Sequence, residues 1–592
     1  MQLPQLRIHE QSQVFTNIFS GLNRNLYTQD GECSEMWNMT LDDYPVMSPR
    51  RRRSLCRSGI TPRGMLAKEN LAWVDGTHLH YGEYDLTTQY GLTLTEDGRP
   101  KQLVSMGAYL CVFPDGKYVN TIDFSDHGEM GARVEAEGLT LSLCRLDGTI
   151  YNSEELVVSD TEPTAPENGD NWLDTSVTPN GLKRWNAGTA EWVQVATTYV
   201  RISGGNFSAF REYDGIEISG LATGDEALKE QVAALNASTI VYGAGDSYLI
   251  VAGMISGAAS TVGKAVFARS VPEMDWVCEC NNRLWGCKYG IVEGQVVNEI
   301  YACKLGDFRN WSCYMGLSTD SYRVSVGTDG PFTGAIIYRN YPTFFKEDCL
   351  HRISGAMPAS FRLDTQSCRG VKEGCERSLV VVGEALYYVA RSAVMQYTGA
   401  MPVEISAGLG KMRLEGAVGG SYGSKYYLSG GTEEGTRLLV YESDRGLWVQ
   451  EDDLRAVAFA PLGDALLCLT EAGELWDLRG GESFLGEKTE PEEDIRWGVT
   501  FGAYGFEDAN QKYLSRFNIR LHLEKGSRAE LRTRYDSHGD WEHQGRMSSP
   551  RTGTFMLPVI PRRCDHIQVR LEGSGEAKVY SISRIYEQGG DG

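Results

Sequence analysis

The sequence lacks long hydrophobic runs. No segment approaches the roughly 18 uninterrupted apolar residues that a membrane-spanning helix requires. The opening residues, MQLPQLRIHE, contain no basic cluster followed by an apolar stretch, so no secretory signal is expected. We therefore expect that the protein does not insert into a membrane and that it is assembled in a cytoplasm. There the fourteen cysteines stay reduced, and those in predicted strands (Cys111, Cys144, Cys468) are buried.

The sequence is also short of positive charge. Lys and Arg number 57 against 79 Asp and Glu, which gives a net charge of −22. Phosphate binding needs a basic surface, so this balance argues against a protein whose whole surface grips nucleic acid. It argues equally against an anionic membrane surface as the partner.

Helical patterning is scarce. The best candidate is 225–236, in which Leu228, Val232 and Leu235 recur at helical spacing. Elsewhere apolar residues alternate with polar ones or run in short bursts, and the chain is rich in glycine (67), tyrosine (30) and tryptophan (12). Short strands joined by tight turns have this composition, so we predict an all-β fold.

An internal repeat indicates the architecture. A turn glycine, a polar residue and an apolar strand recur at Gly383, Gly423 and Gly463, 40 residues apart, and looser copies occur earlier. A period near 40 with several short strands per unit is typical of β-propeller blades. We predict a propeller of about six or seven blades, with a β-sandwich of coincidental spacing as the alternative.

The repeat and the acidic, proline-containing stretches divide the chain. We predict these parts: an N-terminal arm, 1–60; first propeller blades, 61–130; an inserted β-module with one short helix, 131–250; remaining blades, 251–486; an antiparallel β-sandwich, 495–592.

Catalytic motifs are missing. The sequence contains no Gly-x-Ser-x-Gly, His-Glu-x-x-His or phosphate-binding loop. The nearest approaches to a site are the cysteines Cys278, Cys280 and Cys287, the histidines His78 and His80, and the adjacent acids Asp42 and Asp43. Core packing, strand positions and turns explain these groups more simply than zinc binding or glycoside hydrolysis. We expect no catalytic residue, no metal and no cofactor.

Three groups of residues are candidates for contacts with partners. The basic run Arg50, Arg51, Arg52 and Arg53 suits phosphate or an acidic neighbouring subunit, and a solvated loop is an equal alternative. An apolar N-terminal arm needs a partner surface on this chain or a neighbour: Phe15, Ile18, Phe19, Leu22 and Trp37. Three tryptophans of the insertion suit a glycan or partner contact: Trp172, Trp185 and Trp192.

Several stretches resemble propeller-type virion proteins of tailed bacteriophages and prophages, of the tail-nozzle, packaged-DNA-stabilisation or tail-hub class. They are FSGLN (19–23), GE (31–32), MWN (36–38), YPVMSPR (44–50), CRGV (368–371), Gly374, SLV (378–380), Tyr397 with Gly399, and PVEIS (402–406). The segment 161–195 resembles small modules of phage tail and fibre proteins.

This resemblance implies a non-enzymatic structural subunit at the tail or head–tail junction. It would form a homo-oligomeric ring with portal, adaptor or tail proteins, through which DNA passes without tight binding. The virion is then its location, with assembly in the host cytoplasm. Two alternatives stay open: a receptor- or glycan-binding tail component that uses the three tryptophans, and a propeller glycoside hydrolase with carboxylates at the ring mouth.

Overall fold

The computed structural model describes residues 11–506, 511–559 and 562–588, and strands dominate them. The helices are α1 (Leu86–Tyr90), α2 (Lys229–Ala233) and single 3-10 turns at Pro358–Ser360, Glu376–Ser378 and Ala407–Leu409. No helix within these ranges is long and apolar enough to cross a membrane. The all-β class is confirmed.

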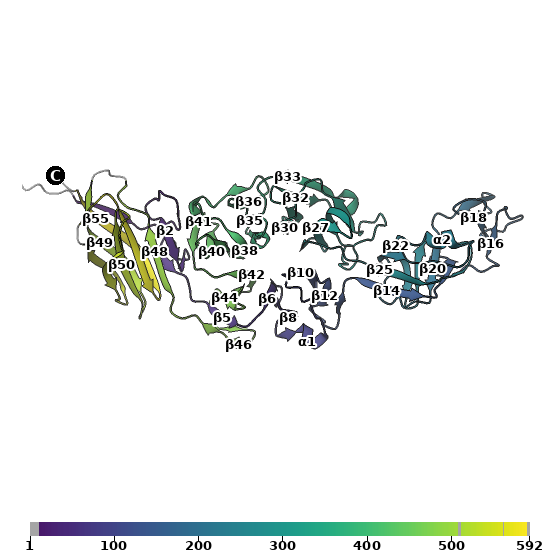
Figure 1. Cartoon of the computed structure of the whole chain (residues 1–592), viewed down its shortest axis with the longest axis horizontal. Coiled ribbons are helices and arrows are strands. Elements are labelled where there is room, and N and C mark those ends of the chain that lie inside the picture. The colour runs from purple at the N-terminus through teal and green to yellow at the C-terminus, as the bar shows by residue number, and fades with distance from the viewer. Residues whose placement is uncertain (1–10, 507–510, 560–561, 589–592) are drawn as a thin grey trace, which may run out of the picture. The chain divides into compact units, whose positions relative to one another are not determined.

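Seven successive antiparallel sheets in the described residues are the blades of a β-propeller (Figure 1). The first four are β6–β9 (Pro62–Ala67, Leu71–Asp75, His78–Tyr81, Tyr84–Asp85), β10–β13 (Gln102–Met106, Tyr109–Phe113, Lys117–Asn120, His127–Glu129), β26–β29 (Trp276–Glu279, Leu284–Val292, Gln295–Ala302, Tyr322–Ser325) and β30–β33 (Gly334–Tyr338, Tyr341–Phe345, Cys349–Ser354, Arg362–Ser367). The next two are β34–β37 (Val380–Val382, Ala385–Val389, Val394–Tyr397, Val403–Glu404) and β38–β41 (Glu415–Tyr422, Lys425–Thr432, Gly435–Glu442, Leu447–Gln450). The seventh combines β42–β44 (Ala456–Leu462, Ala465–Thr470, Leu475–Asp477) with β5 (Ser54–Arg57) and β47 (Glu490–Pro491).

The glycines of the 40-residue repeat form the first hairpin turn of the last three blades. Gly383, Gly423 and Gly463 have φ of 58°, 58° and 57°, and each is the first residue of a two-residue turn. Such turns favour glycine at that position because a Cβ is strained there. The repeat was therefore interpreted correctly as blades, and seven is the upper end of the predicted range.

Two compact units make up the chain. The first comprises the described residues up to Leu103, Phe345–Leu350 and those from Thr365 onward; the second comprises Val104–Phe344 and His351–Asp364. Within the first unit, β34 packs against β38, β38 against β42, and β42 against β6. Blades from opposite ends of the chain are therefore neighbours in this unit.

An N-terminal strand completes the seventh blade. In its sheet β5 lies between β44 and β47, with Leu55 opposite both Trp476 and Glu490. A short hairpin, β45 (Ser483–Phe484) and β46 (Glu487–Lys488), precedes β47. This pairing of strands far apart in sequence holds the seventh blade in place, because the blade cannot come apart without breaking the hydrogen bonds of β5.

The C-terminal part is an antiparallel β-sandwich that takes two strands from the N-terminus. One sheet contains β1 (Gln11–Thr16), β55 (Ala577–Gln588), β49 (Lys512–Leu523) and β52 (Thr552–Pro558), with β53 (Arg563–Cys564) beside β49. The other contains β2 (Cys33–Trp37), β48 (Arg496–Phe501), β54 (Ile567–Ser574), β50 (Arg528–Tyr535) and β51 (Glu542–Met547). The sandwich is confirmed. The separate arm is not found over its described residues, 11–60, because β1 and β2 are built into this sandwich and β5 into the seventh blade; residues 1–10 lie outside the described residues.

The insertion belongs to the second unit and contains two sheets. Eight strands surround one apolar core, in the order β14 (Ala132–Glu137), β25 (Lys264–Arg269), β21 (Gly215–Ser219), β22 (Ser238–Gly245), β23 (Tyr248–Ala252), β20 (Tyr199–Ser203), β15 (Thr140–Cys144) and β24 (Ala259–Ser260). A smaller sheet contains β16 (Leu156–Ser159), β17 (Asn171–Asp174), β18 (Gly181–Asn186) and β19 (Glu191–Gln194). Because β25 pairs with β14, the insertion ends at Arg269 and not at 250 as predicted.

The predicted helix of the insertion is shorter than its sequence pattern. Only Lys229–Ala233 is helical, but Leu228, Val232 and Leu235 are all buried in the core of the eight-stranded sheet. The apolar spacing was therefore a sound guide to burial, whereas the ends of the helix were placed too far apart.

Candidate functional site

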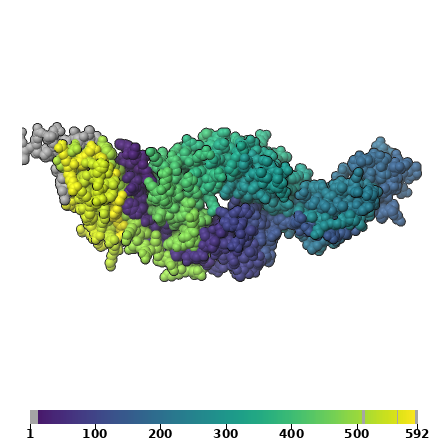
Figure 2. All heavy atoms as spheres, in the orientation of Figure 1, coloured from purple at the N-terminus to yellow at the C-terminus, as the bar shows by residue number. Residues whose placement is uncertain are grey.

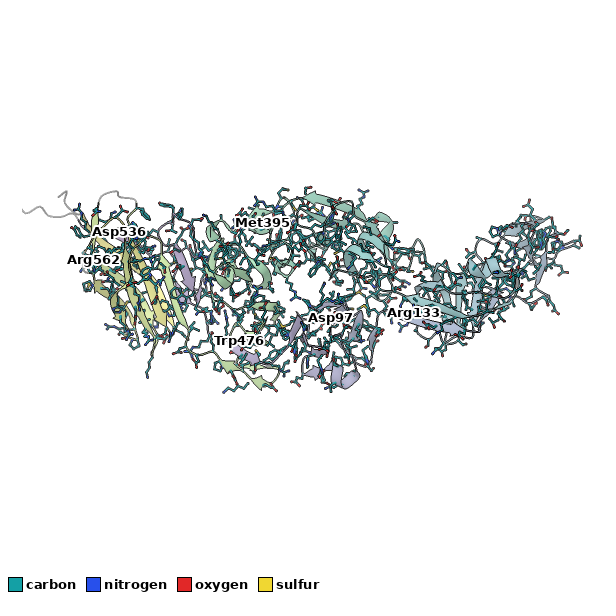
Figure 3. All side chains as sticks on the ribbon, viewed as in Figure 1. Asp97, Arg133, Met395, Trp476, Asp536 and Arg562 are labelled. Carbon is teal, nitrogen blue, oxygen red and sulfur yellow. The ribbon has the colours of Figure 1, made fainter. Side chains whose placement is uncertain are left out.

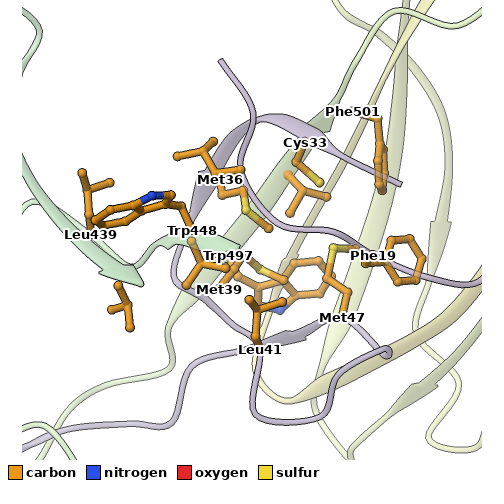
Figure 4. Packing of buried hydrophobic residues seen from close by; sticks show 14 of the residues in the cluster. Phe19, Cys33, Met36, Met39, Leu41, Met47, Leu439, Trp448, Trp497 and Phe501 are labelled. Carbon is orange, nitrogen blue, oxygen red and sulfur yellow. The ribbon is translucent and has the colours of Figure 1, made fainter. Parts of the chain in front are cut away.

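The candidate assembly arm is divided between the core and the surface. Phe19 and Leu22 are buried in one cluster with residues of β41 and β48 (Figure 4). The Trp37 ring lies on the backbone of Gly498, where an added Cβ would come within 2.1 Å of it. The partner surface of Phe19 and Leu22 is therefore this chain's own, which is one of the two predicted possibilities, and not a neighbouring subunit. Trp37 is only half-buried, so for it an assembly contact stays a prediction. Phe15 and Ile18 are 57% and 51% exposed, so for them the contact stays a prediction.

The segment that carries the first part of the phage resemblance, residues 19–50, is here named the joint segment. It touches both neighbours in the first unit, since Leu22 N donates to Trp448 O at 2.7 Å and Asn38 Nδ2 donates to Arg496 O at 2.7 Å. In Figure 2 it is the purple band between the green blades and the yellow sandwich. The resembling residues therefore hold the sandwich to the propeller.

Two glycines of the joint segment are required by close approach of the backbone. Gly21 has φ 77°, and a Cβ there would lie 2.4 Å from Trp448 O. Gly31 has φ 87°, and its Cβ would lie 2.1 Å from Ile18 O. Neither position accepts a side chain without moving backbone, which explains these glycines by geometry.

The basic run is mostly paired within the chain. Arg50 binds Glu492 through two hydrogen bonds of 2.7 and 2.8 Å, and Arg53 binds Glu451 at 2.7 Å and Asp452 at 2.5 Å. Both arginines are buried, so the hypothesis of a phosphate or partner contact is wrong for them. Arg52 pairs with Asp494 at the surface and Arg51 is exposed, so for these two it stays a prediction.

The adjacent acids Asp42 and Asp43 do not face each other as a hydrolytic pair. Asp42 binds Lys425, and Asp43 binds Lys578 at 2.8 Å. Burial raises the pKa of Asp42, but the charge and hydrogen bond of Lys425, the hydrogen bond of Thr40 and the charge of Arg51 together bring that pKa below its usual value. An ionised, lysine-bound carboxylate is not a general acid, so this pair is a structural contact.

The three tryptophans of the insertion come together. The ring centroids of Trp172 and Trp192, and those of Trp185 and Trp192, are 5.4 Å apart in edge-to-face geometry. Trp172 is buried and donates to Ser159 O at 3.0 Å, whereas Trp185 and Trp192 are half-buried. Their predicted contact with a glycan or partner stays a prediction.

A cavity of about 280 Å³ lies beside the strand that completes the seventh blade. Its lining consists of Arg53, Asp452, Leu454, Arg455, Thr470, Ala472, Glu474, Trp476 and Glu492. Trp476, labelled in Figure 3, donates its indole N–H to Glu474 at 2.9 Å. Burial raises the pKa of Glu492, but the hydrogen bonds and charge of Arg50 outweigh it and lower that pKa overall. The cavity therefore gathers three carboxylates around one indole.

A second cavity of about 460 Å³ contains the histidines His78 and His80. His78 Nδ1 lies 3.0 Å from Asp85 Oδ2, and His80 stacks on Trp73 with centroids 4.8 Å apart. Burial lowers the pKa of His80. In the described ranges, no set of three His, Cys, Asp or Glu side chains converges as metal ligands.

Comparisons with known proteins give matches only among solved structures, since no family model and no curated protein matches. An exo-β-1,3-galactanase from Phanerochaete chrysosporium is 9% identical, with 52% of this chain and 94% of that chain covered and a TM-score of 0.21. A glycoside hydrolase is 11% identical (51% and 96% covered, TM-score 0.20). A family 43 arabinoxylan arabinofuranohydrolase from Bacillus subtilis is 9% identical (52% and 94%, TM-score 0.17).

These matches correct one expectation. We predicted a protein that is not an enzyme, and this is contradicted because the matching structures are glycoside hydrolases. No catalytic residue is transferred from them to this chain. None of the three is a virion protein, so the resemblance to phage propeller proteins stays a prediction.

Proposed function

We propose that this chain is a virion component of a tailed phage or prophage, placed in the tail or at the head–tail junction. The observation that carries the proposal is the position of the joint segment. The residues that resemble phage propeller proteins bind the sandwich to the propeller through Leu22, Asn38 and the cluster around Phe19. These residues contact other residues of the same chain, so the resemblance concerns how the propeller and the sandwich are joined.

The surface of the joint segment carries exposed apolar side chains that could contact neighbouring subunits. Leu26 and Tyr27 are 104% and 72% exposed, four and five residues after the buried Leu22. With Phe15 and Ile18 they give the N-terminal region four large exposed apolar side chains. Neighbouring subunits would bury such side chains in a ring, whose heterologous contacts need complementary patches.

Immunogold electron microscopy tests the placement. Particles released from a culture that encodes the chain are labelled with an antibody raised against the purified protein. We expect gold at the tail or the head–tail junction. Unlabelled particles, from a culture in which the antibody detects the chain in the cell lysate, would contradict the proposal.

A second candidate function, glycoside hydrolysis, is favoured by the cavity beside the seventh blade. Asp452, Glu474 and Glu492 supply the carboxylate type that a glycosidase uses in pairs, and Trp476 supplies an apolar face for a sugar ring. In this proposal Glu492, held ionised by Arg50, is the base or nucleophile, and Glu474 is the acid.

Turnover of a broad panel of chromogenic glycosides tests this second candidate. We expect hydrolysis that Glu474→Gln lowers by about 10²-fold or more, the typical contribution of general acid catalysis. Glu482→Gln, an exposed acid that does not line the cavity, is the matched control and retains activity. Silence of the wild-type protein across the panel removes the candidate and leaves the virion proposal untouched.

A further inference from the structure

One face of the small sheet β16–β19 combines indoles with polar side chains. Trp172 lies opposite Lys183, and Trp185 lies opposite Trp192. Directly opposite residues share a face, as do residues two apart on a strand. Lys183 and Trp185 are two apart, so all three tryptophans share one face, together with Asp174, Lys183 and Gln194.

The apolar core of this small sheet lies on its other face. Leu173 and Leu182 are opposite each other, and both are buried, at 0% and 2% exposure. Trp185 on β18 and Trp192 on the edge strand β19 are only half-buried. Trp172 packs into the sheet at 5% exposure, whereas the indoles of Trp185 and Trp192 are not fully taken up by packing.

The polar groups of this face are arranged around the rings. Asp174 Oδ2 accepts from Lys183 Nζ at 2.8 Å, and that ammonium lies 4.6 Å from the centroid of the Trp172 ring. Gln194 is opposite Lys183 and exposed. The indole N–H of Trp192 has no hydrogen-bond partner within the described part of the chain. That nitrogen is itself buried, so a ligand would contact the exposed ring surfaces and the polar groups beside them and not the N–H.

We propose that Trp185 and Trp192, with Lys183 and Gln194 at their edge, bind a neutral carbohydrate chain. Pyranose rings present apolar C–H faces and hydroxyl edges, which match indoles bordered by an ammonium and an amide. The charge of Lys183 is balanced by Asp174, so the face has no excess charge for an anionic ligand. A protein partner fits less well, because charged residues are depleted at the centre of protein interfaces.

The test uses the full chain on an array of neutral oligosaccharides, including α-glucans, β-glucans, chitin fragments and bacterial surface polysaccharides. The best ligand is then titrated by calorimetry. We expect Trp185→Ala to weaken binding roughly tenfold or more, which corresponds to about 1.4 kcal/mol. Trp185→Tyr retains part of the affinity because a phenol ring also stacks. Melting curves confirm that each variant is folded.

Val193→Ala is the matched control. Val193 is next to Trp192 on β19, is 49% exposed and faces the opposite side of the sheet. It should bind as the wild type does. The proposal is overturned if no glycan binds, if Trp185→Ala binds equally well, or if Trp185→Ala instead abolishes binding to a protein. The assay uses isolated protein and so does not depend on the virion role.

Discussion

Glu492 is the residue whose charge is most informative about closure of the seventh blade. It accepts two hydrogen bonds from the buried Arg50 and one from the backbone of Arg53 at 3.1 Å, next to the start of β5. A hydrogen bond to a charged group contributes about 1.5–3 kcal/mol to the stability of the folded state. Glu492→Gln keeps the shape but removes the charge, so we expect a loss of roughly 1.5–3 kcal/mol in the free energy of unfolding at pH 7.

The sign of the pH dependence follows from the lowered pKa of Glu492. Its stabilisation is complete above the unfolded-state pKa of glutamate, about 4.3, and is lost as the pH falls through the lower folded-state value. The difference in the free energy of unfolding between the wild type and Glu492→Gln should therefore become smaller below about pH 4. Urea denaturation at pH 7 and at about pH 3, below the usual pKa of glutamate, measures this change. Glu493→Gln, an exposed neighbour, is the control, and an equal loss in both variants would contradict the account.

At the scale of elements, the first hairpin turn of each late blade depends on a glycine. Gly463 has φ 57°, and a Cβ added there would meet nothing within 4 Å. The cost of Gly463→Ala is therefore conformational, about 1–2 kcal/mol. Thermal unfolding followed by circular dichroism measures it. Asp464→Ala, in the same exposed turn, should change stability by less than about 0.5 kcal/mol. Equal melting temperatures for the two variants would show that the turn carries no strain.

These turns also explain how far the sequence could predict the elements. Gly383, Gly423 and Gly463 repeat because each blade imposes the same positive φ, and such a local requirement is visible in the chain. The pairings of β1 and β5 are not visible, since Gln11 lies opposite Glu587 and Leu55 opposite Trp476. Strand periodicity says which face is buried but does not name a partner hundreds of residues away.

The same reasoning applies to the candidate sites. The sequence placed Trp172, Trp185 and Trp192 on short strands, and the pairing of β17, β18 and β19 brings them together. It could not show that the partners of Arg50 and Arg53 are Glu492, Glu451 and Asp452, because ion pairs across the fold leave no spacing in the chain. The carboxylate cavity around Trp476 was missed for this reason.

At the scale of the whole molecule, both ends of the chain are needed for the sandwich. β1 pairs with β55 and β2 pairs with β48, so without them two strand edges and the core around Phe19 are open. A fragment of residues 495–592 alone should be unfolded or aggregated, because exposed edges and apolar surface favour association. The same fragment with residues 11–40 fused through a flexible linker should fold. Dispersed amide signals in nuclear magnetic resonance spectra of the short fragment would contradict this prediction.

Quantitative mass spectrometry of gradient-purified phage particles tests the central claim most directly. Peptides of this chain are measured against those of the major capsid protein, with an abundant protein of the host lysate as the contamination standard. The account predicts that the chain copurifies with intact particles in a fixed ratio of several copies each. A chain that stays in the soluble lysate, or that declines with further purification as the host standard does, would contradict a role in the virion.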